Sequence, residues 1–313
     1  MPSKRDLVLS LTDPSAPPAA TPAAFFLHFD SRYHAGQPAV DQHLEFFRRT
    51  GMDLVKIQYE QTMPAAPPPE RPADWANAPL FPESFFEAPV RVAEGLVQAA
   101  GDEALVIMTL YSPFMWAKRH GGAERLTQHL REDPAAVKQG LDIMTENVRT
   151  LVRGCQRVGV DGFYASSQGG EAHRFGGTSI FSDYIKPTDL AVWDTLQASR
   201  FNILHVCDYE GAYDDLTPFL DYPGQVVNCS LHVGGRTLTP REAAALFKRP
   251  FMGGLERLGT LASGSPEAIR QAVRSVLAEA PERFMLGADC TVPGDTPWDN
   301  LKVAIDTAHQ HRH

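Results

Sequence analysis

Short apolar runs alternate with longer amphipathic segments along most of the chain. The runs have the length and composition of buried strands, and the longer segments repeat apolar residues at helical spacing. We predict strands at 23–29, 53–59, 104–110, 162–165, 202–207, 226–229, 251–255 and 284–288. We predict intervening helices at 41–50, 84–100, 134–158, 178–199, 214–220, from Thr239 onward, 265–279 and 297–309. Eight alternations of this kind are typical of an α/β fold, the (β/α)8 TIM barrel.

The first residues of the chain do not fit this alternation. Residues 3–11 have the pattern of a short amphipathic helix, and the Pro/Ala-rich stretch 13–22 cannot continue it. We therefore divide the chain into an N-terminal helix and arm, residues 1–22, and a single barrel domain, residues 23–313. A chain of 313 residues with 43% hydrophobic residues is long enough for one such barrel.

Composition and charge exclude several partners. The 29 Lys and Arg residues against 38 Asp and Glu residues give a formal net charge of −9, and no run of basic residues offers a surface for nucleic acid or an anionic membrane. No apolar run approaches the roughly 18 residues of a membrane span, and residues 1–13 lack the apolar core of a signal peptide. We expect a cytoplasmic protein, with a homodimer left open. Its four cysteines are then ligands or buried thiols rather than disulfides.

The stretch 202–207, Asn-Ile-Leu-His-Val-Cys, carries the strongest chemical signal. Strand side chains alternate between faces, so His205 and Cys207 point the same way. Cys229 and Cys290 each close another predicted strand, and in a parallel barrel the four side chains converge on one face. A His and Cys set of this kind favours zinc. The alternative is ordinary burial of thiols and of a core histidine, which is our interpretation of Cys155.

Residues at the other predicted strand ends indicate an active site, because barrel enzymes place their chemistry at the carboxyl ends of the strands. The candidates come from the first four predicted strands: His28, Arg32 and Tyr33, then Glu60, then Phe114, then Ser166 and Gln168. We assign catalysis to Glu60, His28 and Arg32, and substrate binding to Tyr33, Phe114, Ser166 and Gln168. The long Pro-rich loop 64–82 is predicted to cover the mouth of the site.

A set of short motifs stands in a specific order along the chain. The motifs are Asp30-Ser31-Arg32-Tyr33, Gly51-Met52-Asp53, Ser112-Pro113-Phe114, Gly159-Val160-Asp161-Gly162, Leu204-His205-Val206-Cys207, Gly253-Gly254-Leu255, and Pro293 with Thr296-Pro297-Trp298-Asp299-Asn300. This set resembles the uroporphyrinogen decarboxylase superfamily over nearly the whole chain, which implies a (β/α)8 barrel. The decarboxylases of that superfamily carry two arginines, an aspartate and a late histidine. Here Arg32 matches one arginine, His28 stands at the place of the other, Glu60 replaces the aspartate, and residues 287–290 lack the histidine.

The chain is more similar to another branch of that superfamily. The methylcobalamin:coenzyme M methyltransferases carry a His-x-Cys pair after strand five and a distant Cys after strand eight as zinc ligands. This resemblance implies the same role for His205, Cys207 and Cys290. Cobalamin-independent methionine synthase is a similar case, with a glutamate ligand after strand six where this chain has Cys229.

The resemblance implies a zinc-dependent methyltransferase that acts on a small thiol, with a methylcorrinoid (methylcobalamin) on a partner corrinoid protein as the methyl donor. Zinc would bind the thiol and lower its pKa from about 8.5. Cys229 is either a fourth ligand or a core thiol, and Glu60 either accepts the thiol proton or supports a ligand. Arg32 either binds an acidic end of the substrate or forms a surface ion pair. Two alternatives stay open: a lyase that acts on a tetrapyrrole without metal, and a non-catalytic barrel with a structural zinc site.

Overall fold

The centre of the structure, a computed structural model that describes residues 3–15, 18–58, 62–64 and 66–311, is a parallel sheet of seven strands. Neighbouring strands follow the order of the chain, except that an antiparallel hairpin, β6 (His232–Val233) and β7 (Arg236–Thr237), is inserted before β8. The strands of the sheet are β1 (Leu54–Ile57), β2 (Leu105–Tyr111), β3 (Gly162–Ser167), β4 (Ile203–Val206), β5 (Val226–Cys229), β8 (Phe251–Leu255) and β9 (Phe284–Ala288).

The predicted first strand, residues 23–29, does not form a continuous strand. Ala23 and Leu27 make isolated parallel bridges to Leu286 and Val292, at and just beyond β9. The backbone N–H of Asp53, just before β1, donates to Ala23 at 3.0 Å. The segment therefore lies between the two outermost strands but pairs only at single residues. The described part of the chain forms a curled, barrel-like sheet with seven strands in place of the predicted eight.

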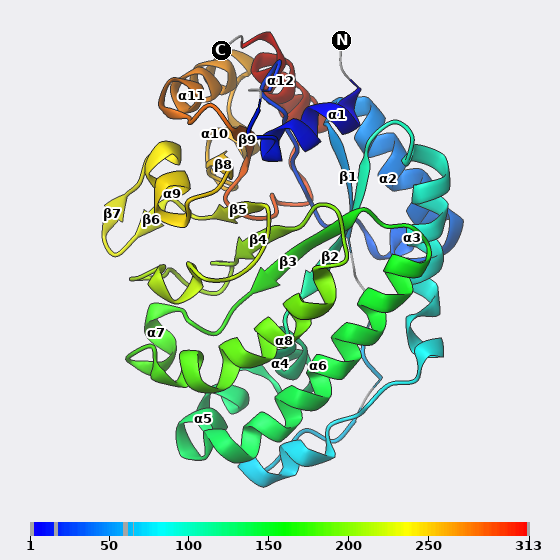
Figure 1. Ribbon diagram of the computed structural model, residues 1–313, viewed down its shortest axis with the longest axis vertical. Helices are drawn as coiled ribbons and strands as arrows, with labels where there is room; N and C mark the ends of the chain where they lie inside the picture. The colour runs from blue at the N-terminus through cyan, green and yellow to red at the C-terminus, as the bar shows by residue number, and fades with distance from the viewer. Residues whose placement is uncertain (1–2, 16–17, 59–61, 65, 312–313) are drawn as a thin grey trace.

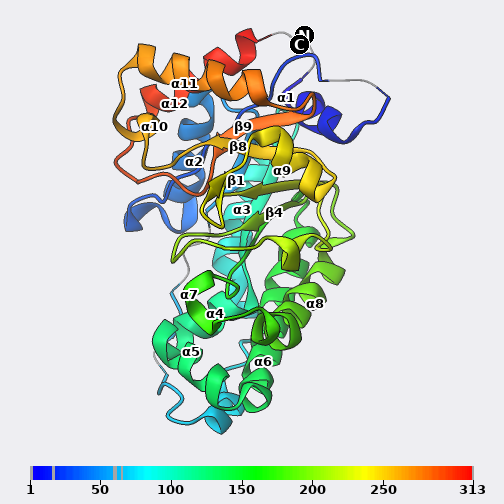
Figure 2. The same cartoon turned by 90° about the vertical axis from the view of Figure 1, so that its left-hand side faces the viewer.

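Helices surround the sheet, as Figures 1 and 2 show. In both views α4, α5 and α6 gather at one end of the molecule and α11 and α12 at the other. The helices are α1 (Lys4–Leu9), α2 (Gly36–Thr50), α3 (Glu87–Ala100), α4 (Pro113–Gly121), α5 (Ala123–Glu132), α6 (Pro134–Arg157), α7 (Ala172–Phe175), α8 (Lys186–Leu196), α9 (Pro240–Phe247), α10 (Thr260–Ser263), α11 (Pro266–Glu279) and α12 (Trp298–Gln310). No described helix combines the length and the apolar character that a membrane span requires.

Helices α4 and α5 were not predicted. The start of α4 nevertheless has the usual signals, because Ser112 accepts the backbone N–H of Met115 at 3.3 Å and Pro113 occupies the first turn. The apolar run after β2 thus forms a helix, and Phe114 is fully buried within it.

Helix α1 lies at the amino ends of β1, β2 and β3. Arg5 donates to the carbonyl of Gly101 at 2.9 Å and forms an ion pair with Asp161, which precedes β3. Lys4 donates to the carbonyls of Gly51 and Met52, just before β1. In barrel folds the carboxyl ends of the strands, opposite to this helix, are where side chains form the active-site cavity.

Candidate active site and metal centre

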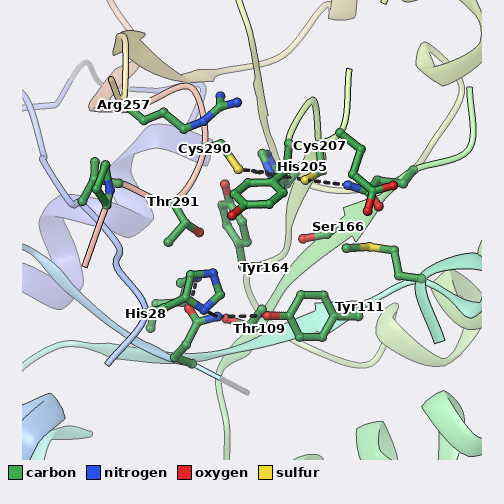
Figure 3. Close-up of a pocket in the computed structure, with 18 of the residues that line it drawn as sticks. His28, Thr109, Tyr111, Tyr164, Ser166, His205, Cys207, Arg257, Cys290 and Thr291 are labelled. Carbon is green, nitrogen blue, oxygen red and sulfur yellow. Dashed lines mark hydrogen bonds between the residues drawn. The ribbon is translucent and has the colours of Figure 1, made fainter. Parts of the chain in front are cut away.

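Three of the four predicted metal ligands meet at the carboxyl ends of β4 and β9 (Figure 3). His205 and Cys207 lie on the same side of β4 because strand side chains alternate, and Cys290 follows the end of β9. Cys290 Sγ lies 3.4 Å from His205 Nε2 and 3.9 Å from Cys207 Sγ. All three residues are buried, and their ligand atoms lie within 4.8 Å of one another.

These separations suit a zinc ion. Tetrahedral zinc, with Zn–S near 2.3 Å and Zn–N near 2.0 Å, holds two sulfurs about 3.8 Å apart and a sulfur and a nitrogen about 3.5 Å apart. The distances in the site, 3.9 Å and 3.4 Å, agree with this to about 0.1 Å. Thiolates and imidazole are also ligands that zinc prefers, whereas magnesium and calcium prefer oxygen. Three protein ligands are the number that catalytic zinc sites use, which leaves one position for an external ligand.

The two thiols of the group differ in acidity. A hydrogen bond from Cys207, together with the neighbouring His205 and Arg257, holds the pKa of Cys290 well below its ordinary value. The same hydrogen bond and complete burial raise the pKa of Cys207. The two thiols therefore titrate as a coupled pair. A bound cation would take the place of the proton between the two sulfurs.

Cys229, the fourth predicted ligand, is not in this group. In the register of the sheet, His205 lies beside Asn228, whereas Cys229 lies beside Val206. Cys229 therefore faces away from the interior, toward the helix layer, and burial raises its pKa to about 12. Cys155 is likewise fully buried with a pKa of about 12, as expected for a packing residue. The prediction for Cys229 treated the end of a strand as sufficient, but the direction of the side chain depends on the pairing between strands.

An aromatic ring supports His205 from the interior. The ring of Tyr164 stacks on the imidazole, with centroids 4.8 Å apart and planes 28° apart. The Tyr164 hydroxyl donates to Asn228 Oδ1 at 2.5 Å, and the Asn228 amide donates at 2.9 Å to the carbonyls of Met252 and Ala288. Among the described residues, the buried Nδ1 of His205 has no hydrogen-bond partner. The orientation of this imidazole is thus fixed by stacking rather than by a hydrogen bond at its second nitrogen.

Gln168, predicted to bind substrate, lines the cavity and also contacts a metal-ligand candidate. Its amide donates to Cys207 Sγ at 3.3 Å, and its carbonyl accepts Lys118 Nζ at 2.7 Å. Lys118 also forms an ion pair with Glu210. The Gln168 amide therefore links Lys118 to Cys207, and its hydrogen bond lowers the pKa of Cys207 against the larger raising effects of Cys290 and of burial.

The group opens on a cavity of about 670 Å³. The wall of this cavity combines apolar side chains, among them Met115, Leu258 and Val292, with polar ones, and one polar part is organised around Gln58. Lys56 Nζ donates to Gln58 Oε1 at 2.9 Å, and the Gln58 amide lies 3.0 Å from the Tyr111 hydroxyl and 3.2 Å from His28 Nδ1. Lys56 also lies 4.8 Å from the centre of the Tyr164 ring, the ring that stacks on His205. The cavity thus has a sulfur-lined part and a hydrogen-bonding part, with Tyr164 between them (Figure 3).

Comparisons with known proteins agree with this architecture. No curated protein sequence matches the chain. Residues 46–311 match the uroporphyrinogen decarboxylase (URO-D) family. The chain belongs to this family. The resemblance noted in the sequence is thereby confirmed.

Solved structures with the same fold include a methyltransferase and a methionine synthase. A methyltransferase from Methanosarcina mazei has a TM-score of 0.79 at 12% sequence identity, and the match covers 98% of each chain. A B12-independent methionine synthase from a Shewanella species, in complex with selenomethionine, has a TM-score of 0.55 at 11% identity and covers 94% of this chain and 97% of its own. At such identities the likeness shows a shared fold.

Of the remaining predicted site residues, some line the cavity and others lie outside it. His28 and Ser166 line the cavity. Arg32 is 72% exposed, lies 3.6 Å from Asp30 and does not line the cavity. Tyr33 lines a separate surface groove, and the buried ring of Phe114 lies against the Arg174 guanidinium. Glu60 lies outside the described residues.

The predicted cover of the mouth also differs. No described residue of the loop 64–82 lines the cavity, because Trp75 anchors this loop elsewhere. Its indole is fully buried and donates to His129 of α5 at 3.0 Å.

Sequence reasoning missed several residues of the cavity, among them Lys56, Gln58, Lys118 and Arg257. One signal was available for the first: Lys56 is a lone charge inside the apolar run Leu54–Ile57, where a barrel strand would turn it inward. For Lys118 and Arg257, which lie in a helix and a loop, the sequence has no comparable signal.

Proposed function

We propose that this chain is a zinc-dependent methyltransferase that moves a methyl group from a methylcorrinoid to the sulfur of a thiol. One observation carries the proposal: His205, Cys207 and Cys290 stand at a spacing suited to zinc, with a cavity in front of them. Family membership and a fold shared with methyltransferases support the reaction class. The zinc site and the corrinoid donor belong to the proposal.

The residues of the cavity would have different roles in the reaction. Zinc, when bound by His205, Cys207 and Cys290, supplies a Lewis acid that lowers the pKa of a substrate thiol from about 8.5. Gln168 donates a hydrogen bond to Cys207 Sγ and fixes that side chain. The polar part around Gln58, with His28, contacts the end of the substrate that is remote from sulfur. Glu60 stays a predicted catalytic residue.

The methyl transfer balances without a further reactant. In the proposed reaction a bond would form between the substrate sulfur and the methyl carbon, and the donor would keep both electrons of its broken bond to that carbon. The thiol proton leaves to solvent. The choice of a corrinoid, carried by a partner protein, rests on the resemblance of the His-x-Cys and distant Cys pattern to the methylcobalamin-dependent branch.

Metal analysis of the purified protein, together with a methylation assay using methylcobalamin and small thiols, tests this function. We expect about one zinc per chain and thiol methylation that a chelator abolishes. Cys290→Ser should lose most of the zinc and the activity, because it removes a ligand. Cys229→Ser is the matched control: it changes an equally buried thiol outside the group, and we expect it to retain both.

Two results would contradict the proposal. Cys290→Ser protein that keeps stoichiometric zinc would remove Cys290 from the site. Wild-type protein that binds no zinc, or that binds zinc but methylates no thiol, would contradict the proposed methyltransferase activity.

A tetrapyrrole carboxy-lyase is the second candidate, because the family takes its name from uroporphyrinogen decarboxylase. Lys56, Arg119 and Arg257 line the cavity and could bind carboxylates. Consumption of uroporphyrinogen by metal-free protein would favour this activity. A structural zinc site is the weaker alternative, since structural sites usually have four protein ligands.

A further inference from the structure

One arginine connects the loops that carry both cysteine ligands. Arg257 follows β8, and its Nη1 donates to Asp208 Oδ1 at 2.8 Å and lies 3.2 Å from Asp289 Oδ2. Asp208 directly follows Cys207, and Asp289 directly precedes Cys290. A single guanidinium group therefore bridges the chain neighbours of two residues whose sulfurs must stay at a fixed distance.

Backbone hydrogen bonds extend this connection. Asp289 Oδ1 accepts the backbone N–H of Arg257 at 2.8 Å and that of Cys290 at 2.9 Å. The backbone N–H of Asp289 donates to Leu255, at the end of β8, at 2.9 Å. The backbone on which Cys290 stands is thus held by Asp289, and Asp289 is held by Arg257.

The charged side chains next to the metal-ligand candidates interact strongly with one another. The side chains of Arg257, Asp208 and Asp289 are only 12–15% exposed, so solvent screens their interactions weakly. Carboxylate oxygens are themselves zinc ligands. Two carboxylates next to the group could therefore turn toward a bound cation, and in this structure the arginine engages an oxygen of each.

We propose that Arg257 is a positioning residue for the zinc site. It fixes the separation of Cys207 and Cys290, and it keeps Asp208 and Asp289 out of the coordination sphere. The ligand set then remains one nitrogen and two sulfurs, with the fourth position left for the substrate thiol. This inference rests on the proposed function, because it concerns the same zinc site.

The test measures metal binding rather than activity. Zinc affinity is determined by competition with a chromophoric chelator, and cobalt(II) is used in place of zinc because its visible spectrum reports ligand type and coordination number. We expect Arg257→Gln to weaken zinc binding by 10- to 100-fold, the usual effect of losing a partner of a ligand. Its cobalt complex should lose visible absorption intensity as a carboxylate oxygen adds to the coordination sphere.

Two further variants separate positioning from general stability. Without Arg257, the carboxylates of Asp208 and Asp289 repel each other and destabilise the protein. Combining Arg257→Gln with Asp208→Asn removes one of these two charges. We therefore expect the stability of the metal-free protein to recover while zinc affinity stays low. Arg249→Gln is the matched control, because Arg249 is also partly buried but donates to the carbonyls of Phe247, Gly224 and Leu220. It should bind zinc like the wild type.

The outcomes distinguish the two proposals. Wild-type zinc affinity and an unchanged cobalt spectrum in Arg257→Gln would overturn the role of Arg257 and leave the proposed function intact. Zinc affinity that recovers together with stability in the double variant would also overturn it, since the arginine would then act on folding alone. A wild-type protein that binds no zinc would instead overturn the proposed function.

Discussion

The two faces of the central sheet have different chemistry, although they belong to the same strands. Asn228 and Cys229 are neighbours on β5, yet Asn228 faces the interior beside His205 and Cys229 faces the helices beside Val206. Asn228 makes three hydrogen bonds that fix the surroundings of the site, whereas Cys229 is a thiol whose pKa burial raises to about 12. A shift of one residue along a strand thus separates a part of the site from the packing layer.

The largest effect that follows concerns these two neighbours. Asn228→Ala leaves the Tyr164 hydroxyl and the carbonyls of Met252 and Ala288 without their partner in the protein interior. Because each unsatisfied buried group costs about 1–3 kcal/mol, we expect the free energy of unfolding to fall by about 4 kcal/mol or more. Cys229→Ala removes one small apolar group and should cost about 1 kcal/mol. Urea denaturation of the three proteins measures both, and equal losses would contradict the assignment of the faces.

The same comparison shows how far the sequence could predict the site. The positions of His205 and Cys207 relative to each other follow from local alternation on one strand, so this part of the site was predictable. The approach of Cys290 follows from the convergence of strand ends in a parallel barrel. The direction of Cys229 depends on the register between β4 and β5, which is set by long-range pairing that the sequence pattern does not contain.

The fold shows the same division between local and long-range information. The apolar runs predicted the seven strands of the sheet, and each lies within one or two residues of its predicted bounds. Residues 23–29 are equally apolar, but they pair only at Ala23 and Leu27, so composition overstated the strand. The bridge from Arg257 to Asp208 and Asp289 joins residues far apart in the chain and has no local signature.

Asp189 is a buried carboxyl group on the otherwise largely apolar helix side of the sheet. Asp189 of α8 accepts hydrogen bonds from the hydroxyls of Ser167 and Tyr222, and burial raises its pKa from 3.8 to about 7. The folded protein therefore holds a proton on Asp189 in the window from about pH 4 to 7, where the unfolded chain has released it. The stabilising contribution is complete below about pH 4 and is lost as the pH rises through 7, on the order of 4 kcal/mol in total.

Asp189→Asn isolates this contribution, because all other titrating groups are shared with the wild type. We expect the difference in unfolding free energy between variant and wild type to shift in favour of the variant as the pH rises from about 4 to 7, and to level off above 7. Urea denaturation at several pH values gives this difference. If it does not change with pH, Asp189 is ionised in the folded protein throughout.

The smallest effect separates two adjacent residues at the end of β3. Gln168 donates to Cys207 Sγ on the interior side, whereas Ser167 donates to Asp189 on the helix side. Gln168→Met keeps the size of the side chain but removes this donor, so zinc affinity should fall by roughly fivefold, the worth of one hydrogen bond, with little change in stability. Ser167→Ala should lower the free energy of unfolding and leave zinc affinity almost unchanged. Chelator competition measures zinc affinity, and urea denaturation measures stability, for both variants. If Ser167→Ala weakens zinc binding as much as Gln168→Met does, the two faces of the sheet are energetically coupled. Residues on the helix side would then affect the metal site as strongly as residues on the interior side.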